Sequence, residues 1–155
     1  MTKLKVGDKA PDFNLPSNTG ENVALSQFLG KKWVVVYFYP MDESPVCSKE
    51  AETFRNKYGA FKELDTEVVG ISSQSVESHV SFASRHELPF VLLSDSGNKV
   101  RKLYGVSSTL GVLPGRETYV VDKKGVVRFV FSSQLQPSRH AHEALSFIKK
   151  DRQKN

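Results

Sequence analysis

Apolar side chains follow one another without a polar break over residues 33–39, Trp-Val-Val-Val-Tyr-Phe-Tyr, in a run that stops at Pro40. A strand with one solvent-exposed face alternates apolar and polar residues, so an unbroken run predicts a strand buried on both faces, as in the centre of a parallel sheet. Residues 66–72 and 89–93 predict two more strands of this kind. The pattern therefore favours a sheet that is covered on both faces.

The segments between these strands have apolar residues at helical spacing. From Lys49 onward, apolar positions recur at steps of three and four residues, which places them on one face of a helix. These positions are Ala51, Phe54, Tyr58 and Phe61. Residues 76–86 predict a second helix, with Val80 and Ala83 facing inward, and residues 99–104 predict a third, shorter one.

The two ends of the chain indicate antiparallel strands. Residues 10–15 and 22–24, joined by a turn rich in Asn and Gly, predict a short hairpin, and residues 117–121 with 126–131 predict another. A last amphipathic helix follows Pro137. Parallel strand–helix–strand units followed by a hairpin and a helix predict an α/β sandwich, in which a mixed central sheet is flanked by helices.

Composition favours a single domain over residues 1–155. Hydrophobic residues make up 39% and charged residues 25% of the chain, a balance typical of globular proteins. The net charge of +5 comes from scattered Lys and Arg, so we expect no nucleic-acid site. The longest apolar run is the seven residues 33–39, which is too short to span a bilayer, so we expect no membrane segment.

Cys47 is the single cysteine of the chain, which excludes an intramolecular disulfide and a zinc site built on several thiolates. Ser44 and Pro45 are residue types of a helix N-cap and a first helical position, so Cys47 is predicted to be the third helical residue. That helix begins beyond the carboxyl end of the strand at 33–39, where ligand sites form in α/β sheets. Unpaired N–H groups and the helix dipole stabilise a thiolate there, so we expect a nucleophilic sulfur.

A lone cysteine can also be a small hydrophobic core residue without any chemistry. The inward face of its helix is already marked by Ala51, Phe54 and Tyr58, and a first-turn residue beside a proline-bounded loop is a poor position for burial. From placement alone, a reactive and an inert Cys47 both stay open.

Pro40, Ser44 and Cys47 stand in the spacing Pro-x-x-x-Thr/Ser-x-x-Cys, which resembles the active-site signature of the peroxiredoxins, thiol peroxidases with a thioredoxin-like fold. The resemblance covers nearly the whole chain and is strongest to the peroxiredoxin Q, or bacterioferritin comigratory protein, branch. The resemblance to the family lies in segments 6–13, 37–40, 93–95, 99–101 and 113–122, and the resemblance to the branch lies in residues 82–101 and the Gly-Arg-x-Thr-Tyr turn at 115–119.

The resemblance implies a role for each residue of the active-site set. Cys47 would be the peroxidatic cysteine, which attacks a peroxide oxygen and becomes a sulfenic acid. Ser44 would hydrogen-bond the peroxide or the thiolate, and Pro40 would shape the pocket wall. Arg116 matches the active-site arginine of the family, and Glu50 stands where an acidic or amide side chain helps to hold that arginine. No cofactor and no metal are expected.

Glu52 stands where many members of this branch carry a resolving cysteine, five residues after the peroxidatic one. Ser44 in place of Thr and Val46 in place of Gly are smaller departures from the branch. Because no second cysteine exists, the Cys47 sulfenic acid must be reduced by an external thiol, namely thioredoxin, glutaredoxin with glutathione, or a small thiol.

We therefore expect a one-cysteine thiol peroxidase that reduces hydrogen peroxide and small organic hydroperoxides. The alternative is a peroxide-sensing or chaperone-like redox protein with little turnover. By resemblance we expect a monomer. The compartment is the cytoplasm, or an organelle stroma of chloroplast type if a transit peptide has been removed.

Four histidines stand outside this set. His140 and His142 point to different faces of a helix and lack a third ligand nearby, so they predict a surface pair rather than a metal site. His79 and His86 are expected to face solvent.

Graded peroxide should add two or three oxygens to Cys47, because a sulfenic acid without a resolving partner is open to further oxidation. Intact-mass measurement after each peroxide addition checks this. A protein that stops at one added oxygen, or at none, would contradict it.

Overall fold

The five-stranded central sheet of the computed structural model, which describes residues 3–106, 108–109 and 113–154, has the strand order β5-β4-β3-β8-β9. The first three strands of this order run parallel to one another, the fourth runs antiparallel to the third, and the last two form an antiparallel hairpin. The strands are β3 (Trp33–Phe38), β4 (Thr66–Ser72), β5 (Val91–Ser94), β8 (Glu117–Val121) and β9 (Val127–Ser132). The mixed sheet flanked by helices that the sequence predicts is confirmed.

Every residue of β3 is buried, because this strand lies in the middle of the sheet and both of its faces are covered. Val35 and Tyr37 pack into a core on one face, and Val34, Val36 and Phe38 pack into a second core on the other. The unbroken apolar run therefore follows from a strand that has no solvent side.

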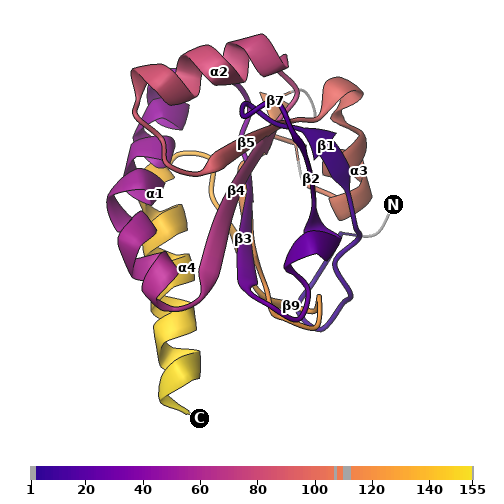
Figure 1. Cartoon of the computed structure of the whole chain (residues 1–155), viewed down its shortest axis with the longest axis vertical. Coiled ribbons are helices and arrows are strands. Elements are labelled where there is room, and N and C mark those ends of the chain that lie inside the picture. The colour runs from indigo at the N-terminus through magenta and orange to yellow at the C-terminus, as the bar shows by residue number, and fades with distance from the viewer. Residues whose placement is uncertain (1–2, 107, 110–112, 155) are drawn as a thin grey trace.

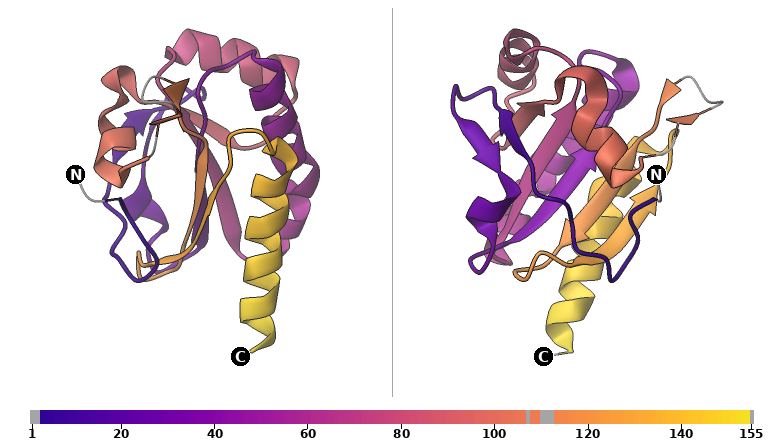
Figure 2. Two further views of the ribbon diagram at one scale, coloured as in Figure 1. Left: turned by 180° about the vertical axis from the view of Figure 1, so that it is seen from behind. Right: turned by 90° about the vertical axis from the view of Figure 1, so that its right-hand side faces the viewer.

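Three helices cover one face of the sheet and one short helix covers the other (Figure 1). On the first face, the long helices α1 and α4 lie side by side, as the left view of Figure 2 shows, and α2 lies beyond the end of β5. On the second face, α3 packs next to the hairpin of β1 and β2. These elements are α1 (Pro45–Glu63), α2 (Val76–Arg85), α3 (Lys99–Tyr104), α4 (Pro137–Gln153), β1 (Asn14–Pro16) and β2 (Asn22–Ala24).

Short elements complete the described chain. Two are 3-10 helices, η1 (Leu25–Phe28) and η2 (Ser96–Asn98). The other two are strands, β6 (Ser108–Thr109) and β7 (Leu113–Pro114), which pair antiparallel with each other. Within residues 3–106, 108–109 and 113–154, no helix is long and apolar enough to cross a membrane.

The prediction for the inward face of α2 is wrong at two positions. Val80 is 46% exposed, whereas His79, which was expected to face solvent, is completely buried. The inward stripe consists of His79, Phe82 and Ala83, at steps of three and four, and Phe82 stacks on Tyr39. A polar residue stands on this face because a buried acid partners it, which the apolar pattern alone does not show.

Candidate active site

Ser44 caps the N-terminus of α1 as the sequence predicts. Its backbone is extended, with φ −74° and ψ 148°, and its Oγ accepts a hydrogen bond from the Cys47 N–H at 3.1 Å. Pro45 occupies the first helical position, where a missing N–H leaves no helical bond unmade. Cys47 is therefore the third residue of the helix. Because Oγ accepts this bond, the hydroxyl keeps its own proton for donation to another group.

Strand register brings Arg116 to the same place. In the antiparallel pair of β3 and β8, Phe38 lies opposite Glu117, so the chain just before β8 meets the chain just after β3. Arg116 and the Tyr39–Cys47 segment therefore lie at one edge of the sheet, although 69 residues separate Arg116 from Cys47.

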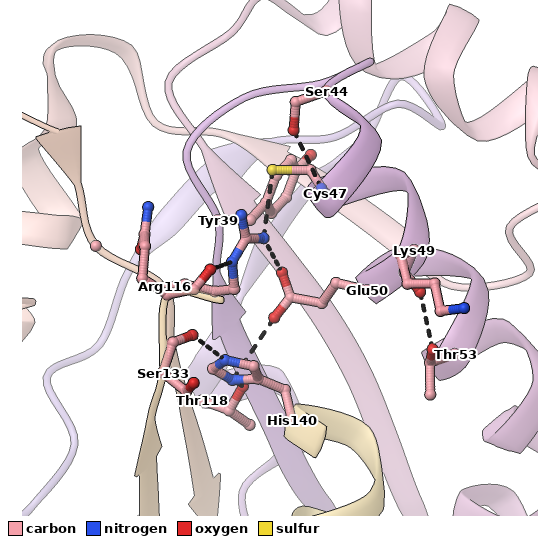
Figure 3. Close-up of polar contacts among 12 residues, drawn as sticks. Tyr39, Ser44, Cys47, Lys49, Glu50, Thr53, Arg116, Thr118, Ser133 and His140 are labelled. Atoms are coloured by element: carbon pink, nitrogen blue, oxygen red, sulfur yellow. Dashed lines mark hydrogen bonds and ion pairs between the residues drawn. The ribbon is translucent and has the colours of Figure 1, made fainter. Parts of the chain in front are cut away.

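The Arg116 guanidinium bridges the cysteine and a glutamate (Figure 3). Its Nη1 donates to Cys47 Sγ at 3.3 Å and to Glu50 Oε1 at 2.6 Å, and its Nε donates to the Gln134 carbonyl at 3.3 Å. Arg116 is only 4% exposed. A buried guanidinium donor at this distance stabilises negative charge on the sulfur or on an oxygen bonded to it.

Cys47 is 1% exposed, which corrects the expectation that its position is a poor one for burial. The sulfur lies behind the capped turn, in the core cluster that also contains Tyr37 and Tyr39. Burial does not make it inert here, because it contacts a charged donor. Cys47 is therefore buried in the core, as the inert interpretation expects, and it also contacts a charged side chain, as the reactive interpretation expects.

Glu50 is completely buried, one helical turn after Cys47. Burial raises its pKa to about 8, although Arg116 and, more weakly, Arg101 act in the opposite direction. Its Oε2 has no hydrogen-bond partner among the described residues. Burial, which disfavours the charged carboxylate, therefore has the larger effect on this group, and the contact with Arg116 has the smaller, opposite one.

Arg101 fixes the two segments that carry the site. Its guanidinium is buried and donates from Nη1 to the Gly115 carbonyl at 2.6 Å and from Nη2 to the Tyr39 carbonyl at 2.7 Å. These carbonyls directly precede Arg116 and Pro40. The resemblance implied no role for Arg101, and its spacing from the other site residues carried no signal of one.

Pro40 is half-buried at the start of the loop that leads to Ser44, and its carbonyl accepts from Gln74 Nε2 at 3.4 Å. Glu52, at the usual resolving position, lies about one and a half turns beyond Cys47 on α1. Its side chain contacts His86, with 3.0 Å between Glu52 Oε2 and His86 Nδ1. The His86 side chain is 15% exposed, so the expectation that it faces solvent is wrong.

Asp42 and His79 form a buried network that the sequence did not reveal. The Asp42 carboxylate accepts from the Tyr39 hydroxyl, the Ser78 hydroxyl and His79 Nδ1, each at 2.7 Å. His79 Nε2 lies 3.0 Å from the Leu93 carbonyl. Burial acts to raise the pKa of Asp42, but the hydrogen bonds from His79, Tyr39 and Ser78 outweigh it and hold that pKa below its ordinary value. The loop before Cys47 is thereby tied to α2.

His140 is completely buried, so the prediction of a surface pair is wrong for it, whereas His142 is exposed. The Nε2 atom of His140 lies 2.8 Å from the Ser133 carbonyl, and the Nδ1 atom of His140 lies 2.8 Å from Thr118 Oγ1. Burial lowers its pKa to about 4, although the Ser133 bond acts in the opposite direction. A signal was present in the sequence, because residues 140, 144 and 148 recur at steps of four on the face that packs inward.

The described residues contain no group of three or more His, Cys, Asp and Glu side chains that could hold a metal ion. What the arrangement offers chemically is a single thiol with a hydroxyl and a guanidinium beside it. These are donors for a peroxide oxygen and for the charge that develops when its O–O bond breaks.

Residues 6–130 match the AhpC/TSA family. The chain is 54% identical over 149 residues to "Peroxiredoxin Q, chloroplastic" of Sedum lineare, which covers 96% of this chain and 80% of that protein. It is 51% identical over 149 residues to the protein of the same name from Suaeda salsa, with 96% of this chain and 69% of that one covered.

Solved structures agree with these matches. Peroxidoxin BcpB from Mycobacterium tuberculosis is 37% identical and superposes with a TM-score of 0.87 over 95% of this chain and 97% of its own. A PrxQ mutant from Xylella fastidiosa is 26% identical and superposes with a TM-score of 0.90 over 98% and 99%. The thioredoxin-like fold expected from the sequence is confirmed.

Asp42→Asn should lower the free energy of unfolding at pH 7 by about 3 kcal/mol, because it removes one partner of a buried charged network. The stabilisation from a depressed Asp pKa is fully present above the ordinary value of about 3.9 and is lost as pH falls through the lower folded value. The difference between wild type and variant should therefore shrink only at acidic pH. Denaturant unfolding at a series of pH values measures it.

The matched control is Asp65→Asn, at an exposed residue with φ +51°, a conformation that Asn adopts readily. That variant should change stability little. Equal stability of wild type and Asp42→Asn at pH 7 would show that the network contributes nothing.

Proposed function

The chain belongs to the AhpC/TSA family and is a peroxiredoxin, a thiol peroxidase with one cysteine, and we propose that Cys47 carries its reaction. In this proposal Arg116 and Ser44 stabilise the reacting oxygens, Pro40 shapes the wall of the site, and Glu50 holds Arg116. The observation that carries it is the shared contact of Arg116 Nη1 with Cys47 Sγ at 3.3 Å and Glu50 Oε1 at 2.6 Å.

In the first step the Cys47 thiolate attacks the terminal oxygen of a hydroperoxide. An S–O bond forms while the O–O bond breaks, the sulfur is oxidised to a sulfenic acid, and the leaving alkoxide or hydroxide takes up a proton. Negative charge moves from the sulfur to the leaving oxygen along this path. In this proposal Arg116 stabilises that charge, because a guanidinium stays charged and presents several donors in a rigid fork.

Regeneration needs two equivalents of an external thiol. The first attacks the sulfenic sulfur, releases water and leaves a mixed disulfide on Cys47. The second attacks that mixed disulfide, which releases the disulfide of the two external thiols and restores the Cys47 thiolate. The finer proposal is that thioredoxin, glutaredoxin with glutathione, or a small thiol supplies these equivalents. Support for an external donor comes from the single cysteine and from Glu52 at the usual resolving position.

For the setting of the reaction we favour an organelle stroma of chloroplast type and a monomer. The relatives from Sedum lineare and Suaeda salsa are both named chloroplastic, which supports the stroma over the cytoplasm. The monomer rests on the resemblance to the peroxiredoxin Q branch. The sensor or chaperone-like alternative is not favoured by these relatives.

Reduced protein mixed with hydrogen peroxide in a stopped-flow instrument should be oxidised far faster than a free cysteine thiolate. Trp33 fluorescence or dimedone trapping follows the oxidation, and Cys47→Ser should abolish it. With an added thiol the wild-type protein should turn over many times. Oxidation no faster than that of free thiolate would contradict the proposal, and stoichiometric oxidation without turnover would indicate a sensor.

Arg116→Lys should lower the rate constant with hydrogen peroxide by roughly 100-fold, the usual order for loss of one preorganised donor to a developing oxyanion. Lysine keeps the charge but cannot reach Cys47 and the Gln134 carbonyl together. The matched control is Arg139→Lys, because the Arg139 side chain is 49% exposed and pairs with Glu143. An equal loss in both variants would mean that Arg116 has no special role.

A further inference from the structure

His140 contacts the two segments that hold Arg116 in place (Figure 3). Its Nε2 partner is the carbonyl of Ser133, whose own N–H donates to the Arg116 carbonyl at 3.3 Å. Ser133 also precedes Gln134, whose carbonyl accepts from Arg116 Nε. The partner of His140 Nδ1 is Thr118, which lies two residues after Arg116 on β8. The imidazole therefore links α4 to both backbone segments beside the guanidinium.

Hydrogen bonding determines which ring nitrogen carries a proton. A carbonyl oxygen only accepts, so Nε2 carries the hydrogen that is donated to Ser133. The ring is neutral at physiological pH, in line with its lowered pKa of about 4. Nδ1 is then an acceptor, and the Thr118 hydroxyl donates to it. Phe131 packs edge-on against the ring, with centroids 4.9 Å apart, and fixes its plane.

Glu50 lies on the other side of this ring. Its Oε2 is 3.6 Å from His140 Nδ1, and no described group donates a hydrogen bond to it. A buried carboxyl oxygen that faces an acceptor and has no donor favours its own proton. His140 therefore limits where the Glu50 carboxyl can lie and favours its neutral form, while Oε1 stays on Arg116.

We propose that His140 is a positioning residue of the peroxidase reaction, whose neutral ring fixes the Glu50 carboxyl and the segments beside Arg116 and so holds the guanidinium against the Cys47 sulfur. This inference rests on the proposed function of Cys47 and Arg116. His140 itself does not touch the sulfur. The sequence of contacts runs from the ring to Glu50 Oε2, from Oε1 to Arg116, and from Arg116 Nη1 to Cys47 Sγ.

The test compares two reactions of the same thiol in His140→Phe. Alkylation by iodoacetamide depends on the thiolate and its access, whereas peroxide reduction also needs Arg116 in place. The ratio of the two rate constants therefore reports the position of Arg116 and is unaffected by a change in thiolate content alone. We expect this ratio to fall about tenfold, less than the roughly 100-fold typical of a reacting group displaced by about 1 Å.

Three further variants sharpen the comparison. His142→Phe places the same substitution at the exposed histidine of the same helix and should leave the ratio unchanged. His140→Asn keeps an acceptor for the Thr118 hydroxyl and should recover part of the ratio. Thr118→Val removes the hydroxyl that orients the ring, at almost constant volume, and should lower the ratio several-fold.

A ratio equal to wild type in folded His140→Phe would overturn the inference and leave His140 with a role in stability only. If circular dichroism shows that this variant does not fold, the same ratio is measured in Thr118→Val, and a ratio equal to wild type there overturns the inference. Failure of the proposed function is recognised separately. Wild-type protein would then react with peroxide no faster than a free thiolate, and the inference would be overturned with it.

Discussion

The site depends on the contact between the Arg116 guanidinium and the Cys47 sulfur, which lie 3.3 Å apart. That contact exists because β3 and β8 pair antiparallel with Phe38 opposite Glu117. A slip of one residue in this register would turn every side chain of β8 to the opposite face of the sheet and carry the adjoining Arg116 out of place. The buried residues of β3 and β8 therefore do more than stabilise the core, because they also set where the positive charge lies.

Two guanidinium groups are buried beside one thiol, which is unfavourable unless their donors find acceptors. Arg101 donates to the backbone carbonyls of Gly115 and Tyr39, so its burial also fixes the segments that carry the site. Arg116 donates to a sulfur, a carboxyl and a carbonyl oxygen. Because burial raises the pKa of Glu50, its carboxyl competes less for the charge of Arg116, and donors already in place can stabilise negative charge on the sulfur without rearrangement.

Because the chain has one cysteine, an oxidised Cys47 can be reduced only by a thiol that enters from outside, so access to the sulfur matters. At 1% exposure, the Cys47 sulfur is shielded from solvent, which protects a sulfenic acid and also restricts the thiols that reach it. The loop in front of it is held by Asp42, which binds Tyr39 on one side and Ser78 and His79 of α2 on the other. The hydrogen bonds of Asp42 therefore hold the segment that leads to Cys47 against α2.

The fold was largely readable from residue types that act locally or by simple periodicity. The run at 33–39 is unbroken because β3 has no solvent side, and the hairpin of β8 and β9 follows from two runs rich in β-branched and aromatic residues on either side of a turn. Ser44 and Pro45 specify the start of α1, and so the place of Cys47, because a cap acts over three residues. Arg116 and Glu50 came from resemblance to a family, not from their spacing.

Only the tertiary structure decided which polar residues are buried and what they contact. His79 and His140 were expected at the surface, yet each lies in the core because a partner distant in sequence satisfies it, Asp42 in one case and Thr118 in the other. Arg101 acts on two carbonyls that only the assembled sheet brings within reach. The sequence by itself determined the strands, the helices and the capped cysteine, since these depend on neighbouring residues. The charge and hydrogen bonding around that cysteine depend on pairs that no local pattern encodes.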